Sequence, residues 1–452
     1  MFVPLIRSLR RFFAIRPGEG FRLSVMAALL FLLLAANNLV KILRDSIFLG
    51  HHSVSELPYL YILVAVFAGA VISLYTRFTV HLSLVRLMLA TNALVIALIA
   101  GFWFLLTYFD PGWSHYAFYL WSAIATVIAV AQLWTLANQI FSPDEGKRLF
   151  GLLAAGGTVG GAAAGFGSTW TIHLSVESNH LLWVVGGLYL AASLLLCMTQ
   201  RRLREKSPAG GTEATSGAEP ATADNVFARL AASRYLKTIG TVILLSVIVS
   251  TLIDFELKSA AKSIYPSKPA LAGFFGSYYG WLSVATFFFQ VILAGKTLSK
   301  LGLSSSLYVT PVALLTGALA IMVWPGLIAA ALTRIADATL RNSIHRSSME
   351  IIYMAVPVNL KKAIKTFLDV VVERVGDASA GLIILIVSLS SVAGYKTYVH
   401  FICAGLIFAW MVLIQFLRSG YSEDMRKGSV SDELLAGRRL TASNQTERSM
   451  ED

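Results

Sequence analysis

The sequence predicts an all-α membrane protein with twelve transmembrane helices in two six-helix pseudo-repeats. Its composition is 56% hydrophobic and only 14% charged, with a mean hydropathy of +0.69, whereas soluble domains carry about 25% charged residues. Apolar runs of roughly 20 residues, the length that crosses a bilayer core of about 30 Å, recur along the whole chain. A polar segment divides these runs into six and six. Together these observations place the chain in the membrane class.

Each apolar run is expected to form one membrane-spanning helix. The ninth and tenth runs meet at Trp324, Pro325 and Gly326, where proline and glycine favour a turn. We expect the spans at 23–42, 57–76, 87–108, 116–140, 149–171, 181–199, 239–257, 271–294, 306–324, 326–345, 369–391 and 397–417.

Lysine and arginine gather in alternate connections, which indicates the orientation, because positive residues in short loops mark the cytoplasmic side. Three lysines after the seventh span, Lys258, Lys262 and Lys268, depart from this pattern. We therefore expect a cytoplasmic-membrane protein with both termini in the cytoplasm. The net charge of +12 is explained by topology rather than by nucleic-acid binding. The residues on the predicted cytoplasmic side are Arg7, Arg10, Arg11, Arg16, Arg22, Arg77, Arg86, Lys147, Arg148, 201–206, Lys296, Lys300, Lys361, Lys362 and Lys365.

Five segments follow from this pattern. Residues 1–22 are expected to form a basic interfacial segment, 23–200 a six-helix bundle, 201–236 a cytoplasmic linker, 237–418 a second six-helix bundle, and 419–452 a disordered tail. Within the linker, residues 207–225 are rich in small and polar residues and cannot bury a core. The charged stretch 39–45 in the first half is matched by 252–258 in the second. Two parallel six-helix halves are typical of a major-facilitator-like transporter.

Charged residues inside the predicted spans are costly, at about 2.5–3.5 kcal/mol each near the bilayer centre. They fall on single helix faces in four spans, through spacings of three, four or seven residues. Six are cations and seven are carboxylates, and this surplus of carboxylates favours proton coupling. The cations are Lys41, Arg44, Lys258, Arg334, Arg341 and Arg374, and the carboxylates are Asp45, Asp254, Glu256, Asp337, Asp369, Glu373 and Asp377.

Two interpretations of these charges stay open. They form ion pairs that only hold the helices in register, or they line a polar cavity between the halves. Charged faces on four separate helices favour the cavity. Asp45, Lys258 and Asp369 lie close to the expected helix ends and are expected to reach the membrane interface instead.

Other patterns point to packing rather than chemistry. The glycine-rich stretch "GLLAAGGTVGGAAAG" lacks the strand and lysine of a phosphate loop and is expected to allow close helix packing. His51 and His52 are expected to form an exposed loop pair rather than a metal or proton site. The aromatic set around Tyr278, Tyr279 and Trp281 is expected to pack or to face lipid. The sequence predicts no enzyme activity, no cofactor and no metal site.

Several motifs resemble those of the ATP/ADP translocase family of nucleotide transporters, in the same order along the chain. "LRDSIFL" is similar to the LKDS segment of that family, "LWTLANQIF" to its FWGFANE segment, and "STLIDFELK" to its VEVTWK segment. The resemblance implies a twelve-helix fold that exchanges nucleotides. Substrate-associated family positions fall on Arg44, Gln139, Asp254 and Asp377. Gln139 loses the family charge and Asp377 reverses it.

The leading hypothesis is a secondary transporter that moves a polar, anionic organic metabolite by alternating access. A nucleotide is one version of this small-molecule substrate, and a proton-coupled carrier for another substrate is a second. Asp254 and Asp377 are the proton-coupling candidates. The rival hypothesis is a non-transporting sensor or assembly protein whose charges form structural pairs. The substrate-binding candidates are Lys41, Arg44, Gln139, Asp254, Lys258, Arg334, Asp337, Arg341 and Asp377.

Overall fold

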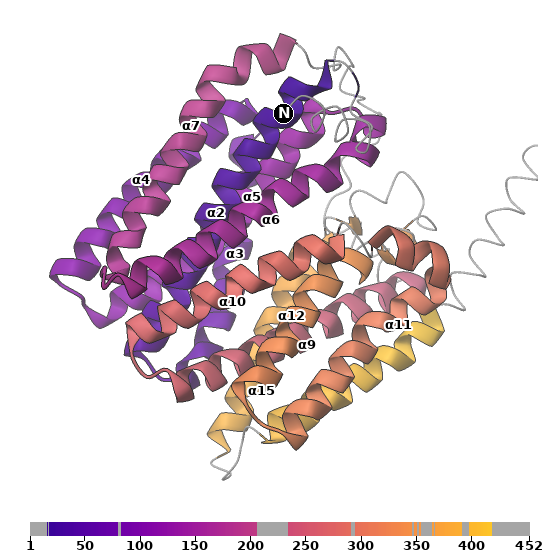
Figure 1. The fold of residues 1–452 in the computed structure, drawn as a ribbon. Helices are drawn as coiled ribbons and strands as arrows, with labels where there is room; N and C mark the ends of the chain where they lie inside the picture. Colours follow the sequence, from indigo (N-terminus) through magenta and orange to yellow (C-terminus); the bar gives the residue numbers. More distant parts are fainter. Residues whose placement is uncertain are drawn as a thin grey trace, which may run out of the picture.

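The protein is helical throughout the part of the chain that its computed structural model describes, and this part contains no strand (Figure 1). The described residues are 16, 18–79, 83–205, 234–290, 294–345, 348–349, 352–353, 364–365, 367–390 and 397–417. Much of the expected basic segment, of the expected linker and all of the expected tail lie outside these ranges. The helix α2 already begins at Glu19, within the expected interfacial segment, and α7 continues to Glu205, within the expected linker.

The helices form two groups along the chain, drawn in indigo to magenta and in pink-red to yellow in Figure 1. The N-terminal group comprises α2 (Glu19–His51), α3 (Leu57–Thr79), α4 (Leu84–Tyr108), α5 (Gly112–Ile140), α6 (Pro143–His173) and α7 (Leu181–Glu205), with single 3-10 turns at Val54–Glu56 and Ser178–His180. The C-terminal group comprises α9 (Arg234–Ile264), α10 (Lys268–Phe288), α11 (Ala294–Val323), α12 (Leu327–Leu340), π-helical turns at Arg341–His345 and Leu368–Val372, α15 (Glu373–Leu389) and a helix over 397–417.

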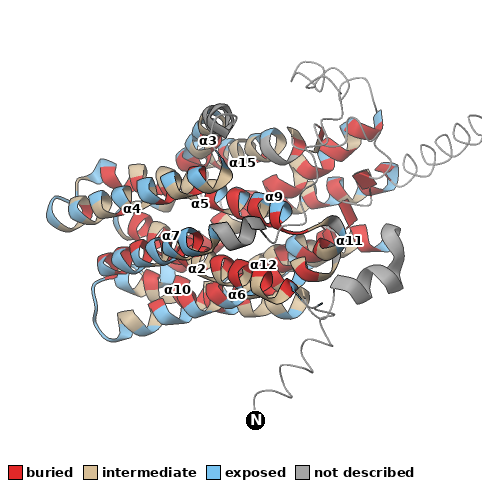
Figure 2. Ribbon diagram, turned by 90° about the horizontal axis from the view of Figure 1, so that it is seen from above, coloured by how far each residue is buried: buried red, intermediate tan, exposed pale blue. Residues whose placement is uncertain are grey.

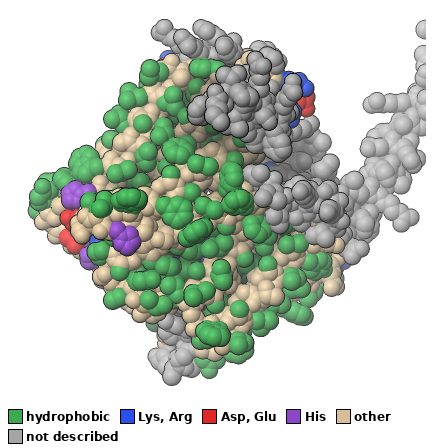
Figure 3. All heavy atoms as spheres, viewed as in Figure 1, with side chains coloured by type: hydrophobic (Ala, Val, Ile, Leu, Met, Phe, Trp, Pro, Cys, Tyr) green, Lys and Arg blue, Asp and Glu red, His purple; other side chains and the backbone are tan. Residues whose placement is uncertain are grey.

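Nine helices in the described part of the chain are long and apolar enough to cross a membrane. The longest of them, α2, has 33 residues and ends at His51, nine residues beyond residue 42, where the first span was expected to end. Exposed hydrophobic side chains cover the outward faces of the bundle, among them Trp170, Met198 and Val323. Buried residues lie on the inward faces (Figure 2), and apolar side chains cover much of the face drawn in Figure 3. This is the arrangement of a protein that faces lipid.

The glycine-rich stretch lies in α6 and packs closely on its neighbours, which confirms the expected packing role. A Cβ atom on Gly160 would lie 2.3 Å from the carbonyl oxygen of Phe31 in α2. A Cβ atom on Gly165 would lie 2.5 Å from the backbone nitrogen of Gly280 in α10. Because only a hydrogen fits at these positions, α6 touches both α2 and the C-terminal group through backbone atoms.

Contacts between the two groups involve the half of the bundle that contains His51, which we call the His51 end. Next to that residue, a Cβ atom on Gly50 would lie 2.8 Å from the Cβ atom of Lys268 in α10, and the Lys268 ammonium donates to Asn179 over 2.8 Å. The α3 and α15 helices meet where a Cβ atom on Gly381 would lie 2.8 Å from the carbonyl oxygen of Pro58.

The opposite end, where α2 begins, is held by ion pairs within the N-terminal group. Arg22 contacts Glu145 at 2.7 Å, and Arg148 contacts Glu19 at 2.7 Å. Ser142 and Glu145 also form a capping box at the start of α6, which satisfies backbone N–H groups there. Glu145 therefore fixes both the start of α6 and its position against α2.

Candidate functional site

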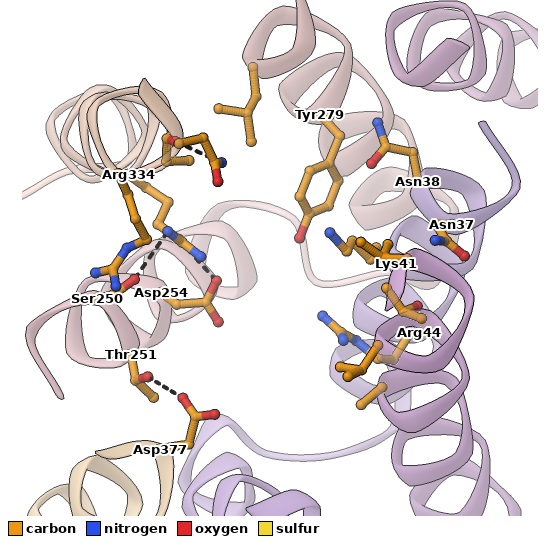
Figure 4. Close-up of a pocket in the computed structure, with 18 of the residues that line it drawn as sticks. Asn37, Asn38, Lys41, Arg44, Ser250, Thr251, Asp254, Tyr279, Arg334 and Asp377 are labelled. Atoms are coloured by element: carbon orange, nitrogen blue, oxygen red, sulfur yellow. Dashed lines mark hydrogen bonds and ion pairs between the residues drawn. The ribbon is translucent and has the colours of Figure 1, made fainter. Parts of the chain in front are cut away.

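A cavity of about 570 Å³ lies between the two groups of helices. Its lining comes from α2, α3, α5 and α6 on one side and from α9, α10, α12 and α15 on the other. On α2 the lining residues recur at helical spacing, through Leu34, Asn37, Lys41 and Arg44. Figure 4 shows Lys41 and Arg44 on one wall and Asp254, Arg334 and Asp377 on the opposite wall.

Seven of the nine residues proposed from the sequence line this cavity. Asp337 is fully buried directly behind the cavity wall and bonds to two of the cations. Gln139 does not join them, because it is exposed near the end of α5. The α5 lining residues run from Tyr119 to Val130, and nine further residues of helix turn Gln139 to the opposite face. The seven residues that line the cavity are Lys41, Arg44, Asp254, Lys258, Arg334, Arg341 and Asp377.

The first group of charges links α2 to α9. The Lys258 ammonium lies 2.7 Å from Asp254 and 3.4 Å from Asp45, and it also donates to the Tyr119 hydroxyl. Asp45 accepts a second contact at 2.8 Å from Arg44 on its own helix. Opposite charges are thus paired across the interface between the two groups.

This arrangement corrects one expectation. Asp45 and Lys258 do not reach the membrane interface, because their exposed fractions are 0% and 1%. The reason is that α2 and α9 continue beyond the expected spans, to His51 and Ile264, so both residues lie inside the helices rather than at their ends. The side chain of Asp369, the third residue expected to do so, lies outside the described residues.

A second group of charges surrounds Asp337 in α12. This carboxylate accepts hydrogen bonds from Arg334, from Arg341 at 3.1 Å and from the Ser250 hydroxyl at 2.6 Å. Arg334 also contacts Asp254 at 3.3 Å, which joins this group to the first. Arg341 opens the π-helical turn that follows α12, a local geometry that is frequent at functional sites.

A third group lies on α15, where Asp377 contacts Arg374 at 2.9 Å and accepts a hydrogen bond from Thr251 at 2.9 Å. Asp377 thus has one close cationic partner, whereas Asp254 lies between Lys258 and Arg334. The two proton-coupling candidates therefore differ in how strongly neighbouring cations hold them as carboxylates.

Lys41 differs from the other cavity cations. Within the described ranges, no ion pair or hydrogen bond reaches its ammonium group, although it projects into the cavity near Tyr279 (Figure 4). The described cations therefore outnumber the carboxylates by one, six to five, and the cavity carries a positive surplus. The five carboxylates that line it or pair with its cations are Asp45, Asp254, Asp337, Glu373 and Asp377.

This balance reverses the surplus of carboxylates expected from the sequence. Glu256 is not one of the cavity carboxylates, because it turns away from the cavity and lies 2.9 Å from His400. Asp369 is not counted among them because its side chain lies outside the described residues. The described charges of the cavity therefore favour an anionic ligand.

Three tyrosines in the cavity wall were not among the residues proposed from the sequence. The Tyr279 hydroxyl donates to Asp45 over 2.9 Å, and the Tyr61 hydroxyl donates to Asp254 over 3.2 Å. The Tyr119 ring lies beneath the Arg44 guanidinium, at 4.6 Å from its centroid. Single tyrosines on apolar helices give no periodic signal, and Tyr279 was expected to pack or to face lipid.

The profile of the TLC ATP/ADP transporter family matches residues 90–324 and 313–421. The chain belongs to this family. Family members that it resembles include ADP,ATP carrier protein 1 of Chlamydia pneumoniae, which is 26% identical over 341 residues that cover 66% of each chain. ADP,ATP carrier protein 4 of Rickettsia conorii is 23% identical over 489 residues, which cover 91% of this chain and 94% of that protein. The alignments with the first chlamydial relatives span just under two thirds of those proteins.

Solved structures show that this family member has a major-facilitator-like transporter fold. The nucleoside transporter NupG superposes with a TM-score of 0.61 at 14% identity, over 87% of this chain and 99% of that one. A bacterial homologue of the iron transporter ferroportin, in an inward-facing state, superposes with a TM-score of 0.60 at 13% identity, over 87% and 98%. At such identities the likeness concerns the fold alone.

Proposed function

We propose that this protein is a secondary transporter that moves an anionic, nucleotide-like metabolite across the bacterial cytoplasmic membrane. The observation that carries the proposal is the Lys41 ammonium, which faces a central cavity without a carboxylate partner among the described residues. A cation held away from bulk water favours an anionic ligand strongly, because little solvent screens the interaction. The relatives named ADP,ATP carriers support a nucleotide-like substrate.

The cavity offers complementary contacts for such a ligand. Its volume of about 570 Å³ falls within the range of about 300–1,000 Å³ for small-molecule sites. Lys41 and Arg44 would meet phosphate or carboxylate oxygens. The Tyr61, Tyr119 and Tyr279 rings offer flat apolar surface for a base or another planar group.

Transport would proceed by alternating access between two six-helix halves, twelve spans in all. The two groups touch through α6 and α10 and through α3 and α15, near the His51 end. Rocking about these contacts would expose the cavity to each side in turn. The halves would correspond to residues 23–200 and 237–418.

Uptake into proteoliposomes tests the proposal. We expect saturable uptake of at least one nucleotide or related organic anion, and an increase of KM by roughly 10–100-fold in Lys41→Gln, since a hydrogen bond to a charged group contributes about 1.5–3 kcal/mol. Lys41→Arg keeps the charge and serves as the matched control. An unchanged KM in Lys41→Gln would remove Lys41 from the site. If no organic anion is taken up, the rival role as a non-transporting sensor or assembly protein gains support.

Departures from the resemblance bear on the substrate. Asp377 stands where the related transporters are expected to carry a lysine, and a carboxylate there opposes a polyphosphate. We therefore include monoanionic and dianionic metabolites in the transport screen beside ATP and ADP. Asp377→Lys should shift the preference towards the more highly charged nucleotides.

Asp377 is also our candidate for proton coupling, ahead of Asp254. Asp254 contacts two cations and is held as a carboxylate, whereas Asp377 has a single close cationic partner in Arg374. Asp377→Asn should abolish accumulation driven by a pH gradient and leave substrate-for-substrate exchange measurable. Accumulation at the wild-type level would make Asp377 a structural residue. Asp254→Asn is the comparison.

Both termini and the segment 201–236 are proposed to lie in the cytoplasm. A cysteine in place of Thr215, in a Cys197→Ser background, should resist an impermeant thiol reagent in intact cells. A cysteine in place of Val176, in the α6–α7 connection at the His51 end, should react. The reverse pattern would invert the topology.

A further inference from the structure

A cluster of histidines and acidic residues lies at the His51 end, outside the central cavity. His51 is the last residue of α2, and His52 is its C-cap. Asp110 lies between α4 and α5, and His115 lies in the first turn of α5. Figure 3 shows histidine and acidic side chains gathered at one end of a surface that is otherwise largely apolar. The expectation of an exposed histidine loop pair holds in part: His51 is exposed, but it ends α2 rather than lying in a loop, and His52 is partly buried against His115 and Glu56.

Three side chains of the cluster present their ligand atoms to one point. One nitrogen each of His51 and His115 and a carboxylate oxygen of Asp110 all lie within 4.8 Å of one another. The two imidazole rings are stacked, with centroids 4.2 Å apart and an angle of 14° between their planes. Both rings direct Nε2 at the Asp110 carboxylate, over 3.4 Å from His51 and 2.8 Å from His115.

The remaining ring nitrogens are oriented by other partners. His51 Nδ1 lies 2.8 Å from the carbonyl oxygen of Ile47, which can only accept a hydrogen bond. His115 Nδ1 lies 3.0 Å from His52 Nε2. His52 Nδ1 lies 3.2 Å from Glu56, which also accepts a hydrogen bond from Tyr116. Such outer partners hold the ring of a metal-binding histidine and fix its tautomer.

Three contacts of this cluster are hydrogen bonds between ring nitrogens and their partners, namely His51 with Ile47, His115 with Asp110 and His52 with His115. A neutral imidazole carries one N–H hydrogen, so three neutral rings can supply all three. A neutral His51 that donates to Ile47 leaves the lone pair of its Nε2 facing the Asp110 carboxylate over 3.4 Å. A cation between these two atoms would bind both.

We propose that His51, Asp110 and His115 form a binding site for a divalent transition-metal cation of the zinc type. Two imidazole nitrogens and one carboxylate oxygen match the three-ligand sites in which Zn²⁺ keeps a fourth position for water. Bonds of about 2.0–2.2 Å around a tetrahedral ion place ligand atoms roughly 3.3–3.6 Å apart. Here the nitrogen–oxygen distances are 3.4 and 2.8 Å and all three ligand atoms lie within 4.8 Å of one another, so small side-chain movements would admit the ion. Imidazole ligands favour Zn²⁺ over Mg²⁺ and Ca²⁺.

The site would join three segments of the N-terminal group, namely the end of α2, the α4–α5 connection and the start of α5. Metal binding should therefore raise the apparent melting temperature, because the ion binds the folded arrangement of these segments. Gly50, which precedes His51, packs against Lys268 of α10. The site thus lies beside a contact between the two groups without contributing to the central cavity.

The experiment uses full-length, tag-free protein after treatment with a chelator. Zn²⁺ should raise its melting temperature, Co²⁺ should give the visible absorption of a tetrahedral complex, and Mg²⁺ should do neither. His51→Gln is the leading variant because this side chain is partly exposed. It should weaken Zn²⁺ binding by more than Glu56→Gln does, for which we expect about 10–100-fold as for other outer partners. Asp110→Asn should behave like His51→Gln.

The matched control is His173→Gln, which removes an exposed histidine from the same end of the bundle and should bind Zn²⁺ as the wild type does. Equal Zn²⁺ affinity in the wild type and in His51→Gln would overturn the proposal. An equal response to Mg²⁺ would overturn the assignment to a transition metal. Because binding is measured without substrate, neither result depends on whether the protein transports nucleotides.

Discussion

At the residue scale, Glu145 shows how one carboxylate can tie two helices together. Burial raises the pKa of Glu145, but hydrogen bonds from Arg22 and Ser142 outweigh this and hold its pKa below the ordinary value of 4.5. A carboxyl group whose pKa is lower in the folded protein stabilises the fold above its unfolded pKa. That stabilisation is lost as the pH falls through the lower, folded value.

We therefore expect the effect of Glu145→Gln on the melting temperature to depend on pH. At pH 6–7 the variant should be less stable than the wild type by about 1–3 kcal/mol, because Arg22 loses a charged partner. The difference should shrink as the pH is lowered below about 4.5. Glu177→Gln is the control, because this exposed carboxylate accepts a hydrogen bond from Asn179 and forms no ion pair within the described residues. A difference that stays constant down to pH 3.5 would contradict this account.

Residue-level prediction from the sequence was most successful for charges related by helical spacing. Lys41 and Arg44, or Arg334, Asp337 and Arg341, share a face in any helix, so the cavity walls were predictable. The pairing of Asp45 with Lys258 was not, because it joins helices from different halves and no local pattern encodes it. Gln139 was misplaced because its assignment came from a motif, while the helical phase of α5 turns it away from the cavity.

At the element scale, α6 packs both against α2 in its own group and against α10 in the C-terminal group. Its glycines let backbone atoms of α2 and α10 approach where a methyl group would collide. The sequence predicted this packing, because small residues recur at helical spacing in that stretch. The π-helical turns at Arg341–His345 and Leu368–Val372 were not predictable, since a single inserted residue leaves the hydrophobic period almost unchanged.

Two neighbouring glycines of α6 give a direct test of this surface. Gly165→Ala should lower the apparent melting temperature and the transport rate, because its Cβ atom would lie 2.5 Å from the Gly280 nitrogen, and such overpacking costs about 1–3 kcal/mol. Gly167→Ala meets no atom within 4 Å and should be neutral or slightly stabilising, since alanine favours a helix by about 1 kcal/mol over glycine. Equal behaviour of the two variants would show that the close approach does not matter.

At the scale of the whole molecule, the sequence predicted the helical membrane class and most helix positions, because hydropathy alone marks them. The ends were less predictable, since α2 and α9 carry polar residues in their last turns and continue past the apolar runs. This extension places Asp45 and Lys258 inside the protein and so changes their role.

The pair formed by these two residues has a consequence for the transport cycle. Lys258 and Asp45 join the two groups, yet each keeps a second partner on its own helix, Asp254 for Lys258 and Arg44 for Asp45. When the groups separate at this end, neither charge is stranded, which avoids the cost of about 3–5 kcal/mol for an orphaned buried charge. The ion pair can therefore open without leaving a buried charge unpaired.

Removing the same-helix partner of Asp45 should therefore slow the cycle more than removing the ion pair between the groups. Arg44→Gln removes the same-helix partner, and its maximal exchange rate should fall below that of Lys258→Gln, which removes the pair between the groups. The reverse order would show that the Asp45–Lys258 ion pair itself limits opening.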